Sequence, residues 1–393
     1  MQLFKGLVTL GFLITGCATG RYADLRWAEM AARAGDQAEL QEQLKQLQKA
    51  NPEDLEPFLL AMRLGAPPSA VPSQHKHLLT LATTSRTDLL ALARELAPDS
   101  PLRRPVMRAL LKAGAVVEAE RLTKGNHEQL LIALERGDPV TTQRLLVDLG
   151  KERQPSDTAV RDLTTALRQL EPAGTPASRK ALEDLAVRRS AGKALQSLKG
   201  APEDDCLAAI VGGLALEELD QPAAATQRLE AGKCVTSRAH WARLGFSLSP
   251  QEARLVLEQM LEAAPLNRTA LETALTLYGP DHPLHLIATQ RLAAWVPDDR
   301  RALAAIVERE QREGRWLAAA GWIDRSLRFA WDEVLHAQAL RLMARAGADK
   351  RGHPRQQEFR HRLEWLRSRR PELAQAIDQV VAGNAPPDAT ATP

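Results

Sequence analysis

Apolar residues recur at intervals of three and four positions along most of this chain. The run Leu89, Leu90, Ala93 and Leu96 is an example, and such spacing places apolar side chains on one face of a helix. Proline and glycine residues interrupt the pattern and mark the ends of helices. Between residues 53 and 200 the pattern predicts helices over 87–97, 103–113, 127–136, 140–150, 157–170 and 178–198. The predicted fold class is all-α.

A longer period follows beyond residue 205. Small residues stand where two paired helices would touch, with Leu229 as a large apolar residue between them: Gly213, Ala225 and Gly232. Residues that end successive units lie 32 and 34 positions apart: Pro265, Pro297 and Trp331. A period of this length is typical of stacked helical hairpins, because a single hairpin cannot bury its apolar face alone.

One segment carries a family pattern. It reads Trp241-Ala-Arg-Leu-Gly-Phe-Ser-Leu248 and is followed by Ala253, Leu257 and Pro265. This segment resembles the tetratricopeptide repeat (TPR), although Leu248 replaces the usual Tyr, Leu257 replaces the usual Phe, and the hairpin is one helical turn short. The resemblance is good over 205–331 and moderate over 23–52 and 332–371. It implies a right-handed α-solenoid of TPR-like helical hairpins.

The first residues are predicted to form a targeting segment. Lys5 precedes an apolar run from Leu7 to Ile14, which is too short for a permanent membrane span. The sequence Ile14-Thr-Gly-Cys17 that ends the run resembles a bacterial lipobox, which implies cleavage before Cys17 and acylation of that residue. Because Ala18 rather than Asp follows, the resemblance implies the outer membrane, with the protein facing the periplasm. The alternative is an ordinary secretory signal that happens to end in a cysteine.

These observations predict four parts of the chain. A lipoprotein signal peptide covers 1–16, and degenerate helical repeats cover 17–171. The TPR-like domain covers 179–383, after a linker that is rich in proline and small residues, Glu171–Ser178. The last residues, 384–393, are expected to be a disordered tail.

Two further cysteines, Cys206 and Cys234, lie at equal distances from a predicted hairpin turn at Asp220. Residues so placed face each other on antiparallel helices, and the compartment permits disulfides, so we expect these two to form one. The alternative is a pair of buried free thiols. No metal site is predicted, and the histidine pair His282 and His285 is interpreted as two surface side chains.

The composition excludes some classes of function but does not identify the function. Hydrophobic residues make up 44% of the chain, aromatic residues 4%, and the formal net charge is +3, which excludes a general nucleic-acid binder. Residues 341–370 are an exception, with ten Lys and Arg against three acids. This segment is either a solvated helix face or a surface for an anionic partner such as lipid phosphate, acidic glycan or an acidic protein.

Candidate chemistry is sparse. No familiar catalytic or nucleotide-binding motif occurs, so we expect no enzyme and no cofactor. Six of the seven tryptophans follow residue 240, and they are either core residues or exposed anchors for a partner. TPR arrays bind partners along a concave groove, and the resemblance places these residues there: Leu214, Phe246, Tyr278, Arg301, Glu308, Arg341 and Arg345.

The resemblance to lipid-anchored TPR proteins implies a scaffold. Such a protein would bind partners in the envelope during assembly of a secretin, a pilus or an export machine, or would act as an adaptor of cell-wall enzymes. The alternative is a protein that binds or processes cell-wall glycan at a site without a familiar motif.

Overall fold

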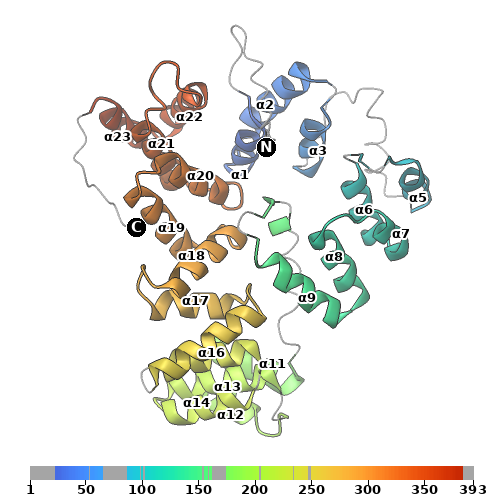
Figure 1. The fold of residues 1–393 in the computed structure, drawn as a ribbon, viewed down its shortest axis with the longest axis vertical. Coiled ribbons are helices and arrows are strands. Elements are labelled where there is room, and N and C mark those ends of the chain that lie inside the picture. The colour runs from blue at the N-terminus through green and yellow to red at the C-terminus, as the bar shows by residue number, and fades with distance from the viewer. Residues whose placement is uncertain are drawn as a thin grey trace, which may run out of the picture.

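The computed structural model describes residues 23–383 except 53, 65–85, 98, 101, 153–154, 158, 162–173, 203–204, 233 and 247–248. Regular structure within these residues consists of helices, and they contain no strand (Figure 1). The predicted all-α class is confirmed. The predicted signal peptide, Cys17 and the predicted tail lie outside the described residues, so their assignments stay predictions. No helix in the described part is long and apolar enough to span a bilayer.

The helices follow one another in pairs that pack side by side. The N-terminal part holds α1 (Leu25–Arg33), α2 (Gln37–Ala50), α3 (Glu56–Arg63), α5 (Arg86–Glu95), α6 (Arg103–Lys112), α7 (Val116–Arg121), α8 (Asn126–Arg136) and α9 (Pro139–Leu149). A second series begins with α11 (Pro176–Ala186), α12 (Ala191–Ser197), α13 (Cys206–Glu218), α14 (Pro222–Ala231), α15 (Val235–Gly245), α16 (Pro250–Ala263) and α17 (Arg268–Leu277). It ends with α18 (Pro283–Trp295), α19 (Arg300–Arg312), α20 (Trp316–Leu327), α21 (Glu333–Arg345), α22 (Gln356–Arg369) and α23 (Pro371–Val381).

Short polar side chains fix where many helices begin. The carboxylate of Asp299, for example, accepts a hydrogen bond from the N–H of Ala302 at 2.9 Å, and Asp332 accepts from Leu335 at 3.0 Å. Such caps satisfy backbone donors that have no partner within the helix. Aspartates fill the same position before α1, α2, α9 and α13. Three residues that the sequence pattern places at the ends of repeats all lie between helices: Pro265, Pro297 and Trp331.

The small residues in the hairpin of α13 and α14 allow close approach, as predicted. A Cβ atom placed on Gly213 would lie 2.5 Å from Cγ of Leu229, and one on Gly232 would lie 2.5 Å from Cβ of Ala209. Ala225 and Leu229 are both fully buried. Larger residues at these glycines would force the two helices apart.

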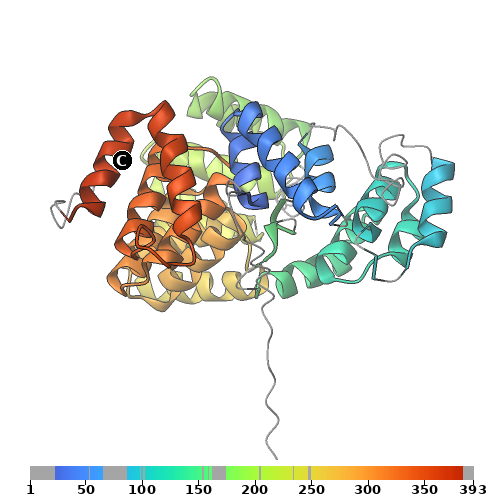
Figure 2. The same cartoon turned by 90° about the horizontal axis from the view of Figure 1, so that it is seen from above.

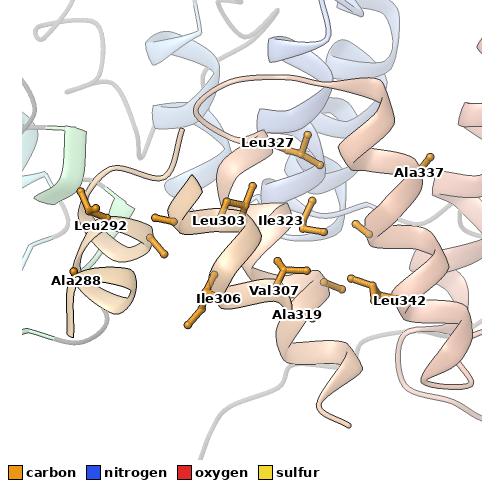
Figure 3. Packing of buried hydrophobic residues seen from close by; sticks show 14 of the residues in the cluster. Ala288, Leu292, Leu303, Ile306, Val307, Ala319, Ile323, Leu327, Ala337 and Leu342 are labelled. Atoms are coloured by element: carbon orange, nitrogen blue, oxygen red, sulfur yellow. The ribbon is translucent and has the colours of Figure 1, made fainter. Parts of the chain in front are cut away.

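The largest core cluster runs through the C-terminal helices. Figure 3 shows its centre, where apolar side chains of α18, α19, α20 and α21 face one another. Leu303 and Val307 of α19 lie towards Ala319 and Ile323 of α20 there, and each of the four is at most 4% exposed. Alternation of large and small side chains lets neighbouring helices interlock.

The N-terminal hairpin is part of this same core. Trp27 and Met30 of α1 belong to the cluster that contains Ala337 of α21 and Trp365 of α22. In Figure 1 the blue α1 lies beside the orange α20, although almost 300 residues separate them. The arc of α5, α6 and α7 projects away from the C-terminal helices in both Figure 1 and Figure 2. The first hairpin therefore closes back onto the end of the chain.

Two predicted elements differ from the structure. The single helix predicted over 178–198 is two helices, α11 and α12, because Arg189 adopts a left-handed conformation with φ of 47°. The predicted linker Glu171–Ser178 ends inside a helix, since Thr175 caps α11 and Pro176 is its first residue. The helix predicted over 157–170 lies largely outside the described residues.

Candidate functional site

The predicted groove residues lie on or directly after five helices of the second series. Leu214 packs with the small core of α11, α12 and α13. Phe246 and Tyr278 follow the ends of α15 and α17 and meet edge to face, with ring centroids 5.7 Å apart. The side chains of Arg301 and Glu308 are exposed on α19.

The last two groove residues lie on α21. Arg341 is half-buried, while Arg345 is exposed and places its guanidinium 5.3 Å from the ring centroid of Trp316. The structure thus brings together the two aromatic residues, Phe246 and Tyr278, and places the other five on α13, α19 and α21.

An open pocket of about 510 Å³ lies between the start of α18 and the exposed side of α19. It contains Glu308, the one predicted groove residue that lines it. Its other lining residues are Pro280, Asp281, His285, Leu286, Thr289, Ala305, Arg309, Arg312 and Glu313. Both signs of charge and a small apolar floor therefore border the same space.

Ion pairs arrange the charged rim of this pocket. Arg309 Nε lies 3.1 Å from Glu313 Oε1, and Arg312 Nε lies 3.9 Å from Glu308 Oε1. Both pairs are one helical turn apart and partly exposed, so each is worth a few tenths of a kcal/mol, roughly 0.3–0.5. Such weak pairs can exchange their partners for groups of a bound segment at little cost.

Aromatic groups lie between α17 and α18, next to His285, which lines the pocket. The ring of His282 stacks on Tyr278 with centroids 4.2 Å apart, and Nδ1 of His285 lies 2.9 Å from the carbonyl oxygen of Tyr278. His282 also caps α18 by accepting the N–H of Leu284 at 3.2 Å. The two histidines are thus placed by Tyr278 and the helix start, and no group of metal-ligating residues occurs in the described part of the chain.

A second cluster forms where α1 meets the C-terminal helices. Trp27 is 1% exposed, and its ring stacks on His336 and meets Trp365 edge to face, with centroid distances of 5.5 and 5.3 Å. Trp331 closes the other side of His336 at 5.1 Å. Nε1 of Trp27 donates to Glu39 Oε1 at 2.8 Å. Three aromatic rings therefore enclose one histidine.

A buried ion pair lies next to these rings. The guanidinium of Arg362, which is 0% exposed, donates to both carboxylate oxygens of Asp324 at 2.7 and 3.0 Å. Burial opposes ionisation of Asp324, but the charge and hydrogen bonds of Arg362 and Arg355 lower its pKa to about 2. Nε of Arg362 also donates to Nε2 of His336 at 3.2 Å. Burial and this neighbouring charge lower the pKa of His336 well below 6.5, so the ring is neutral.

Polar contacts also join α2 to α22. Nε2 of His361 lies 2.7 Å from Glu39 Oε1, and Nε1 of Trp365 donates to Asp36 Oδ2 at 2.8 Å. Arg369 lies 2.8 Å from the same oxygen of Asp36. The pKa of Glu39 is lowered, because hydrogen bonds from His361 and Trp27 outweigh its burial. These polar contacts fix the orientation of the α1–α2 hairpin on α22, in addition to the burial of its apolar side chains.

Half of the basic residues in the segment 341–370 form ion pairs within the protein. Five of its arginines pair with acids of the same chain: Arg355, Arg362, Arg367, Arg369 and Arg370. Arg351 and Arg360 are exposed. An anionic partner for this segment stays a prediction, and the surface that could contact it is smaller than the sequence suggests.

Cys206 and Cys234 form a disulfide, with Cα atoms 5.9 Å apart. Cys206 is the first residue of α13, and Cys234 caps α15 just after the end of α14. The bridge therefore joins the open end of the hairpin, as its equal distances from the turn predict. Beside it Asp205 caps α13; although burial opposes ionisation, hydrogen bonds led by Thr175 lower its pKa to about 2.

Three of the seven tryptophans are core residues, and the other four are half-buried. Trp27, Trp295 and Trp365 are at most 8% exposed, and the remaining four are partly buried against core clusters. Sequence reasoning did not single out His336, Asp324 or Arg362. The sequence offered one signal for Arg362. This residue lies next to Leu363 in a helix whose apolar residues face the core, so its burial could have been expected.

Comparison with protein-family models and with curated proteins finds no match to this chain.

Proposed function

We propose that this protein is a lipid-anchored scaffold that faces the periplasm and binds protein partners through the surface of α17, α18 and α19. It is a right-handed α-solenoid of TPR-like hairpins, held at the outer membrane by the lipid on Cys17. The pocket that Glu308 lines carries this proposal. Its mixed charges and adjacent aromatic residues suit an extended polar peptide segment.

Several features support this function. Successive antiparallel hairpins give an extended surface on which neighbouring helices present side chains to one partner. The ends of α15 and α17 place Phe246 and Tyr278 beside the start of α18. Aromatic and charged side chains together are typical of residues that supply binding energy at protein interfaces.

The experiment compares cross-linked complexes recovered from envelopes that contain different variants. We expect Glu308→Lys and Tyr278→Ala to lose partners that the wild-type protein retains. The control is Leu255→Ala, because Leu255 is 55% exposed on α16 and does not line the pocket. Equal recovery from the wild type and from the Glu308→Lys and Tyr278→Ala variants would contradict the proposal. So would binding or turnover of purified cell-wall glycan in place of a protein.

A further inference from the structure

Three segments that are distant in the sequence meet around Glu29 of α1. Its carboxylate, only 9% exposed, pairs with Arg63 of α3. It also lies 3.4 Å from Arg161 and 3.9 Å from Arg328, which directly follows α20. One buried acid thus faces guanidinium groups from three parts of the chain.

A second acid, Asp157, lies in the same junction. It pairs with Arg328 and lies 3.6 Å from Nε of Arg325, too far for a hydrogen bond. Nη2 of Arg325 donates instead to the carbonyl oxygen of Pro155 at 2.8 Å. Arg33 Nε adds a contact to the carbonyl oxygen of Arg328 at 3.3 Å.

Positive charge exceeds negative charge among these described residues. Three arginines share two carboxylates in these ion pairs: Arg63, Arg325 and Arg328 against Glu29 and Asp157. The side chains of Arg325 and Arg328 are only 12% and 16% exposed. Like charges at this depth are screened less by solvent than charges on an open surface.

Two observations indicate that the arginine side chains of this junction are crowded together. The Nε atoms of Arg325 and Arg328 are both buried and have no hydrogen-bond partner. Burial and the adjacent charge of Arg328 lower the pKa of Arg325, and burial and Arg161 lower that of Arg63. A buried donor without an acceptor is costly, and a cluster of such cations is stabilised by a negatively charged acceptor.

We infer that this junction binds a phosphate-type oxyanion between α1, Asp157 and the end of α20. The several oxygens of such an anion can accept from the forked guanidinium groups of Arg325 and Arg328. The bound anion connects the first hairpin to the C-terminal helices. The inference is independent of the partner-binding pocket, which lies on α18 and α19.

The first test uses the purified full-length protein and inorganic phosphate. Titration calorimetry is expected to show one site per chain. The melting temperature should rise by roughly 2–5 °C when phosphate replaces chloride at equal ionic strength and exceeds its Kd at least tenfold. Identical melting temperatures and no binding heat in the wild type would overturn the inference, whatever the variants do.

The second test uses Arg325→Gln, which removes one donor group and leaves Arg328 paired with Asp157. Loss of a charged hydrogen bond should weaken phosphate binding on the order of tenfold or more. In chloride this variant should be at least as stable as the wild type, because repulsion is relieved. A purely structural arginine would instead lose stability in both buffers.

The matched control is Arg254→Gln, since Arg254 is exposed and pairs only with Glu258 one turn away. It should bind phosphate as the wild type does. If Arg325→Gln fails to fold, Arg325→Lys keeps the charge without the fork and should bind with intermediate affinity. Wild-type affinity in both Arg325 variants would refute the assignment.

The source of the anion follows from a comparison with glycerol 3-phosphate, which carries the chemistry of a lipid headgroup. Binding at least tenfold tighter than that of inorganic phosphate would identify a headgroup as the ligand. Equal or weaker binding would identify free phosphate. Both results require that phosphate binds at the junction.

Discussion

Replacement of Trp27 by Ala is expected to release the N-terminal hairpin from the C-terminal helices. The indole is 1% exposed and contacts the rings of His336, His361 and Trp365 at centroid distances of 5.3 to 5.9 Å. Loss of a buried Trp side chain typically costs about 3–5 kcal/mol. The variant also removes the donor to Glu39 and the ring beneath the guanidinium of Arg362. We therefore place the cost near the upper end of this range.

Hydrogen exchange shows which helices lose stability in this variant. If opening of the hairpin becomes easier by about 4 kcal/mol, amides of α1 and α2 should exchange up to roughly 1,000-fold faster. Amides of α13 and α14 should exchange at unchanged rates. These two helices form the hairpin whose open end the disulfide closes. Urea unfolding followed by circular dichroism measures the overall cost without relying on tryptophan fluorescence.

Trp316→Ala is the matched control, because Trp316 is partly buried at the start of α20 and contacts Arg345 rather than α1. This variant should speed exchange in α20 and α21 and leave α1 protected. Wild-type exchange rates in α1 and α2 of the Trp27 variant would refute the reasoning. The hairpin would then be held by contacts other than the aromatic cluster.

Three further predictions concern the disulfide, a buried histidine and the lipid. Reduction of the Cys206–Cys234 bridge should lower the free energy of unfolding by about 3–4 kcal/mol, measured by urea unfolding with and without reductant. Because the folded pKa of His336 is depressed, the unfolded chain takes up its proton first as the pH falls below 6.5, so stability should decrease there. Its slope of at most about 1.4 kcal/mol per pH unit should be absent in His336→Gln, while His240, whose pKa burial also lowers, keeps its own contribution. Cys17→Ser should move the protein from the membrane to the soluble periplasmic fraction, and a variant that stays in the membrane would show that the lipobox interpretation is wrong.

Local features of the fold were predictable because they depend on near neighbours. Helix periodicity, the close contact at Gly213 and the disulfide all follow from residues within about thirty positions of each other. The break at Arg189 was not predictable in this way, because no glycine or proline marks it. Ser190 follows it as the cap of α12, which is a weak signal.

Contacts between distant segments could not be predicted from the sequence. Trp27 meets Trp365 only because the intervening helices follow a path that returns α1 to α22. Each turn between helices changes that path, and the sequence pattern does not specify those angles.

The central claim is that a protein partner binds at the pocket on α18 and α19. The most direct measurement places a photo-reactive amino acid at position 308 of the full-length protein and exposes intact cells to light. The control is position 187, whose Val side chain is 74% exposed at the end of α11. We predict a discrete protein adduct from position 308 and none from position 187. No adduct at position 308, or the same adducts from both positions, would contradict the account.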